Sequence, residues 1–141
     1  MSLVSNTQRS STRRLTCLAI MLLLIPLGLL CRFVPIGLPP LIVKYGGSFL
    51  WAATVYWFIA FLLARQKPLA LGLISLIATA AIEFVKQIQS PPLDLFRDTF
   101  LGKVLLGRYF SYTDIAVYWI AVACAVWMDH STIHGRHASK E

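Results

Sequence analysis

Four long runs of apolar residues constrain the fold of this chain more than any other feature. They cover residues 15–34, 47–64, 69–89 and 111–128, and about 20 apolar residues are needed for a helix to cross a bilayer. Only 13% of the 141 residues are charged, against about 25% in soluble domains, and a soluble domain of this size has no room for so much apolar area. We therefore expect an all-α integral membrane bundle of four transmembrane helices.

The segments between the runs complete the predicted organisation. Residues 1–14 read as a flexible cytoplasmic arm, residues 15–128 as the transmembrane domain and residues 129–141 as a polar C-terminal tail. No small-x-small cleavage site follows the first run, so we expect an uncleaved helix there instead of a signal peptide. Apolar residues recur at helical spacing over about residues 93–106, which predicts one amphipathic helix before Gly107, either interfacial or re-entrant.

The net charge of +7 has a different meaning here from the one it has in a soluble protein. The basic residues lie between apolar runs, which indicates topology signals and contacts with anionic lipids, not nucleic acid binding. Arg13 and Arg14 directly precede the first run, so we expect both termini in the cytoplasm. This orientation leaves six cations on the opposite side, more than topology alone favours: Arg32, Lys44, Lys86, Arg97, Lys103 and Arg108.

Charged residues gather at the level of that opposite side. Glu83 lies late in the third run, about 20 Å from its start, and Lys86 shares its helical face at i+3. Asp114 begins the fourth run near the same level, Arg32 ends the first, and Arg97 lies between the third and fourth. A carboxylate within a membrane span is costly unless it is paired or hydrated. We therefore expect these side chains to meet in one layer.

Two interpretations of this layer stay open. In the first, buried ion pairs lock the outer segments onto the bundle, as in a membrane scaffold or subunit. In the second, the layer is an outward-facing pocket for a lipid headgroup or another anion, held by Glu83, Arg97 and Asp114 with Lys86 and Arg32 assisting. Trp51 is a further candidate ligand contact. The partners expected are membrane lipids, anionic ones included, and the sequence leaves open a homo-oligomer or a partner membrane protein.

No motif calls for a cofactor, a metal or an enzymatic activity. The chain has no phosphate-binding glycine loop and no nucleophile elbow. The three histidines, His130, His134 and His137, lie in the polar tail, where we expect no metal site. A membrane enzyme that acts on a lipid-linked substrate stays a third alternative.

The order and spacing of a set of residues resemble a family of small bacterial membrane proteins, the domain-of-unknown-function 2809 family. The set consists of Tyr45, Gly47, Leu50, Trp51, Ala52, Ile82, Glu83, Phe84, Arg97, Thr99, Gly102, Leu106, Gly107, Phe110, Asp114 and Tyr118. The resemblance implies a four-helix inner-membrane protein with no assigned activity, in which Glu83, Arg97 and Asp114 are the matching polar positions. A looser likeness to VanZ-like proteins would imply a cell-envelope role. The chain departs from the family pattern at Ser48, Lys86 and Tyr112.

Overall fold

The computed structural model describes residues 2–35, 37–107 and 109–138, with side chains for residues 10–35, 37–107 and 109–132. The described residues form helices and no strand. The helices are α1 (Ser2–Phe33), α2 (Pro40–Leu62), α3 (Pro68–Val85), α4 (Pro91–Asp98), α5 (Phe100–Leu105) and α6 (Tyr112–Ala138). Four of them, α1, α2, α3 and α6, are long and apolar enough to cross a membrane. The expected all-α membrane bundle is confirmed.

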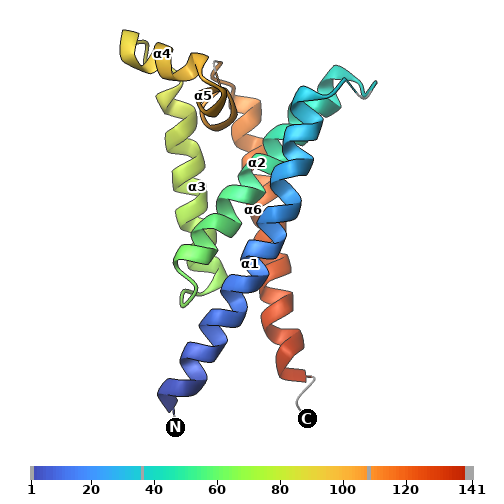
Figure 1. The fold of residues 1–141 in the computed structure, drawn as a ribbon, viewed down its shortest axis with the longest axis vertical. Helices are drawn as coiled ribbons and strands as arrows, with labels where there is room; N and C mark the ends of the chain where they lie inside the picture. The colour runs from blue at the N-terminus through green and yellow to red at the C-terminus, as the bar shows by residue number, and fades with distance from the viewer. Residues whose placement is uncertain (1, 36, 108, 139–141) are drawn as a thin grey trace.

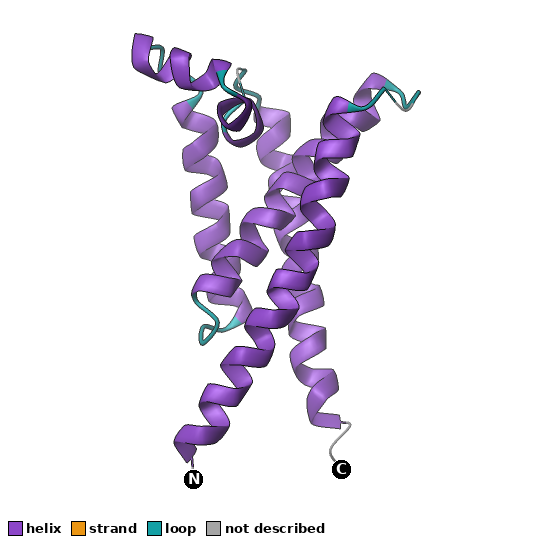
Figure 2. Ribbon diagram, viewed as in Figure 1, coloured by secondary structure: helices purple, strands orange, loops and turns teal. Residues whose placement is uncertain are grey.

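The bundle is built around α2 and α6. Helix α2 packs against α1, α3 and α6, and α3 also packs against α6. The start of α1 and the end of α6 lie at the same end of the bundle, while α4 and α5 lie across the opposite end (Figure 1). Loops are confined to these two ends (Figure 2). The end that carries α4 and α5 also holds a cavity and is called the cavity end.

Small side chains bring the long helices together. An added Cβ at Gly72 of α3 would lie 2.7 Å from Val126 Cγ2 of α6, so these two helices approach closely. Helices in membranes associate through such small residues because lipid provides no hydrophobic driving force, so close van der Waals packing must hold the helices together. The main core cluster consists of Cys17, Tyr56, Trp57, Ala60, Leu71, Val122 and Ala125. Large apolar residues such as Leu22, Leu23 and Leu69 are exposed, as expected for surfaces that face lipid.

The first and last helices are longer than the apolar runs. Helix α1 begins at Ser2, so the segment expected to be a flexible arm is helical from Ser2 onward, and α6 continues through the predicted tail to Ala138. Arg13 explains part of this difference, because its guanidinium donates to the backbone oxygens of Ala64, at 3.0 Å, and Gln66, at 2.6 Å. Hydropathy marks the apolar part of a helix and not the point where its backbone hydrogen bonds stop.

The single amphipathic helix predicted before Gly107 is two helices. The chain turns at Thr99, whose side chain caps α5 by accepting a hydrogen bond from Gly102 N at 3.0 Å. Gly102 lies so close to α4 that a Cβ there would be 1.9 Å from the Phe96 carbonyl oxygen. The second helix does end before Gly107, which has a φ of 66°, a left-handed conformation that glycine adopts without strain.

Candidate functional site

A cavity of about 520 Å³ lies at the cavity end of the bundle. The end of α1, the start of α2, α5 and the start of α6 contribute to its walls, together with Gly107, Tyr109, Phe110 and Ser111 of the loop before α6. Its charged lining residues are Arg32, Lys44, Lys86 and Asp114. Among the described residues, the lining therefore combines three cationic side chains with one carboxylate.

Gly107 keeps the cationic groups accessible to the cavity. A Cβ built on Gly107 would lie 3.6 Å from Arg32 Nη2 and 3.9 Å from Lys86 Nζ. No side chain at this position fills the space between the backbone and the two cations. Because Gly107 also needs its left-handed backbone to end α5, one residue both turns the chain and leaves these groups open.

Glu83 lies behind the cavity wall and is fully buried. Its Oε2 accepts hydrogen bonds from Lys86 Nζ at 2.6 Å and from the Tyr118 hydroxyl at 2.9 Å. Its Oε1 accepts a third from Ser111 N at 2.9 Å. Glu83 does not line the cavity. It joins the end of α3 to the start of α6 and holds the ammonium group of Lys86 in place.

Asp114 differs from Glu83 in both its position and its hydrogen bonding. It lines the cavity and its exposed fraction is only 7%, yet its Oδ1 accepts no hydrogen bond from any residue that the structure describes. Arg32, Lys44 and Lys86 line the same cavity, but none of them forms an ion pair with Asp114 in the part of the chain that the structure describes. Buried acceptors without partners are rare in proteins, so Asp114 Oδ1 stands out as an unsatisfied atom in the wall of a charged cavity.

Arg97 does not join the layer in which the sequence placed it. Its exposed fraction is 4%, and it is absent from the described lining of the cavity. Its Nη2 donates to the Val85 carbonyl oxygen at 2.9 Å, and its Nη1 pairs with Asp94 Oδ1 at 2.9 Å. A cation that satisfies the last carbonyls of a helix stabilises that helix end. Arg97 thus fastens α4 to the end of α3.

Four of the six candidate residues predicted from the sequence line the cavity: Arg32, Trp51, Lys86 and Asp114. The ring of Trp51 packs against Tyr118, with centroids 5.3 Å apart. The sequence interpretation did not select Lys44 or Tyr118 as site residues. The sequence feature that could have identified them is their position, because both belong to segments next to the candidate residues.

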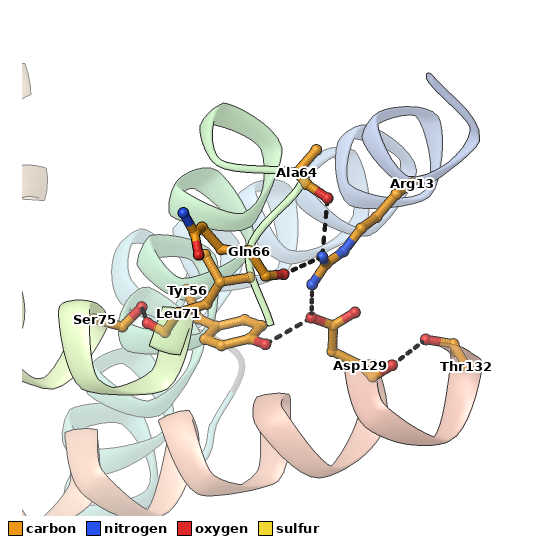
Figure 3. Close-up of polar contacts among 8 residues, drawn as sticks. All are labelled: Arg13, Tyr56, Ala64, Gln66, Leu71, Ser75, Asp129 and Thr132. Carbon is orange, nitrogen blue, oxygen red and sulfur yellow. Dashed lines mark hydrogen bonds and ion pairs between the residues drawn. The ribbon is translucent and has the colours of Figure 1, made fainter. Parts of the chain in front are cut away.

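A second polar cluster lies near the end that carries the termini, and the sequence did not reveal it (Figure 3). Asp129 Oδ2 accepts from Arg13 Nη2 at 2.5 Å and from the Tyr56 hydroxyl at 2.7 Å. These three side chains come from α1, α2 and α6. The available signal was a cation just before the first apolar run and a carboxylate just after the last. It was missed because neither segment was expected to be ordered.

Nothing in the described residues suggests a metal centre. No group of three or more His, Cys, Asp or Glu side chains that could hold a metal ion occurs among them. The side chains of His134 and His137 lie outside the described residues, so the expectation for the three tail histidines stays a prediction.

One family model matches the chain. Its description is "Protein of unknown function (DUF2809)", and it matches residues 37–122, which is more than half of the sequence. The charged lining residues Lys44, Lys86 and Asp114 fall within the matched segment, whereas Arg32 and the pair of Arg13 and Asp129 fall outside it. No solved structure matches the chain.

Proposed function

Because the chain belongs to the DUF2809 family, whose description assigns no activity, we propose its function from the cavity itself: this membrane protein binds an anionic group, such as a lipid headgroup. The observation that carries the proposal is the set of cations Arg32, Lys44 and Lys86 around one cavity, whose described lining holds a single carboxylate. An arginine fork and lysine ammonium groups are the side chains that bind phosphate in proteins.

The size and place of the cavity support a lipid headgroup. Its volume of about 520 Å³ is in the range of small-molecule sites. It lies at the ends of the membrane-spanning helices, where headgroups are found. Trp51 and Tyr109 also line it, and tryptophan and tyrosine are enriched at this level of a membrane.

The proposal includes an orientation in the inner membrane of a bacterial cell. With Arg13 and Arg14 in the cytoplasm, the cavity end faces outward, because it lies opposite the ends of α1 and α6 that carry the termini (Figure 1). The ligand would then be taken from the outer leaflet or from the space beyond it. A cell-envelope role, which the looser likeness to VanZ-like proteins also implied, would follow from this orientation.

A scaffold is the second candidate function, and the bonding of Glu83 favours it. Its three hydrogen bonds connect helices and reach no further than the bundle itself. We assign Glu83 and Arg97 to holding the cavity in shape. A protein in which Arg32, Lys44 and Lys86 also served only the fold would need no ligand.

Native mass spectrometry of the full chain in a neutral detergent tests the proposal. Phosphatidylglycerol and phosphatidylcholine are added to wild type, Arg32→Gln and Lys44→Gln. We expect the wild type to prefer phosphatidylglycerol and each variant to bind it roughly tenfold more weakly, since a hydrogen bond to a charged group contributes about 1.5–3 kcal/mol. Lys67→Gln, which changes an exposed cation at the other end of the bundle, is the matched control.

The same measurement decides between the two functions. Folded variants that retain wild-type binding of phosphatidylglycerol would contradict the proposal. If in addition wild type shows no preference between the two lipids, the scaffold becomes the better account.

A further inference from the structure

The unsatisfied carboxylate of Asp114 indicates which kind of anion the cavity accepts. We propose that the ligand is a phosphate ester whose alcohol part carries a hydroxyl or ammonium group, and that this group donates a hydrogen bond to Asp114 while the cations hold the phosphate. The inference rests on the proposed function and narrows it to a chemical class. An anion without a hydrogen-bond donor would leave Asp114 Oδ1 without a partner.

Three residues that line the cavity with Asp114, namely Lys86, Ser111 and Tyr118, donate to other acceptors. Lys86 Nζ and the Tyr118 hydroxyl both donate to Glu83, at 2.6 and 2.9 Å. Ser111 N also donates to Glu83, and the Ser111 hydroxyl pairs with that of Thr113 at 2.6 Å. The bundle thus satisfies Glu83 and leaves Asp114 Oδ1 without a described partner.

A carboxylate in this position must either be satisfied from the cavity or lower the stability of the protein. An acceptor buried without a partner retains its full desolvation cost, and the cost is greater for a charged group. Asp114 would also repel a simple anion that is held by Arg32 and Lys44. A ligand with a donor beside its phosphate turns this repulsion into a hydrogen bond.

The volume of the cavity fits this class of ligand. At about 520 Å³, it exceeds what a single phosphate ion fills, so room remains for the alcohol part of an ester. Two sources supply such a group: a membrane lipid with a glycerol or ethanolamine headgroup, and a water-soluble phosphodiester with the same headgroup. The chemistry recognised is the same in both.

Two lipids of equal charge test the inference. Phosphatidylglycerol carries headgroup hydroxyls, phosphatidylethanol carries none, and each has one negative charge. We expect the full chain in neutral detergent to bind phosphatidylglycerol at least about tenfold more tightly by native mass spectrometry. Asp114→Ala should bring the ratio close to one, in part by improving binding of phosphatidylethanol. Asp94→Asn, which removes an exposed negative charge outside the cavity but keeps an oxygen acceptor for Arg97, should keep the ratio.

The outcomes separate this inference from the proposed function. Equal binding of both lipids by wild type overturns the donor requirement but leaves an anion site, whereas binding of neither lipid overturns both. A preference that survives Asp114→Ala overturns the role of Asp114. The wild-type comparison holds even if Asp114→Ala fails to fold. Glycerophosphoglycerol identifies the source: competition with the lipid at similar concentration indicates a soluble ester, and a lack of competition indicates the lipid.

Discussion

Glu83 and Asp114 are two buried carboxylates at one end of the bundle with different surroundings. Glu83 accepts three hydrogen bonds, including one from the nearly buried ammonium of Lys86. Glu83→Gln would leave that ammonium without its counter-charge. Since breaking a buried ion pair from one side costs about 3–5 kcal/mol, we expect the free energy of unfolding to fall by a similar amount, measured by thermal unfolding in detergent without added lipid.

Asp114→Asn provides the matched control for that substitution. It changes a carboxylate of similar burial whose Oδ1 has no described partner. Neutralising a buried carboxylate that forms no ion pair should cost far less than neutralising Glu83, because no partner is left unsatisfied. If the two variants lose stability equally, the distinction between a carboxylate that holds the fold and one that faces the ligand is wrong.

How far the sequence predicts these residues depends on how local their contacts are. The pair of Glu83 and Lys86 follows from a spacing of three on one helix, and the structure contains it. The meeting of Arg32, Lys86 and Asp114 follows from helix ends that share one membrane level. The partner of Arg97 does not follow, because it depends on how α4 turns back onto the end of α3.

At the scale of the helices, apolar length predicted all four spanning elements but not where they end. A helix continues into polar sequence where side chains outside the apolar span form hydrogen bonds with the rest of the bundle, as Arg13 does with the loop after α2. The break between α4 and α5 depends on Thr99 capping the second helix, which one amphipathic pattern over both segments concealed. The spacing of apolar residues identifies the apolar face of a helix, whereas tertiary contacts decide whether the helix is continuous.

Helix α1 is tied to α6 by the contact between Arg13 and Asp129, which also accepts from Tyr56. The side-chain exposed fractions of the pair are 13% and 3%, so neither charge is well hydrated. We expect Arg13→Gln and Asp129→Asn each to lower stability, and the double variant to lose less than the sum of the two. A double-mutant cycle on thermal unfolding should give a coupling of about 0.5–3 kcal/mol.

The control for this cycle is Arg65→Gln paired with Asp129→Asn. Arg65 is an exposed cation at the same end of the bundle. The free-energy changes of that pair should simply add. Additive changes for Arg13 and Asp129 as well would mean that their contact does not hold α1 in place.

For the molecule as a whole, the orientation in the membrane decides what the cavity can reach. Tyr109 is 82% exposed at the cavity end, and Lys67 is exposed between α2 and α3 at the other end. In a variant without native cysteines, expressed in intact bacterial cells, a membrane-impermeant maleimide should label Tyr109→Cys. Lys67→Cys should be labelled only after the membrane is permeabilised, because the proposed orientation puts that end in the cytoplasm.

The reversed labelling pattern would place the cavity in contact with the cytoplasm and the inner leaflet. Phosphate esters are present on both sides of such a membrane, so the charge of the cavity alone does not distinguish the two. The cations at the cavity end nearly balance those at the other end, which means that Arg13 and Arg14 of α1 must dominate insertion for the proposed orientation to hold. Arg13→Gln together with Arg14→Gln should therefore weaken the labelling asymmetry, whereas Lys44→Gln together with Lys103→Gln should strengthen it.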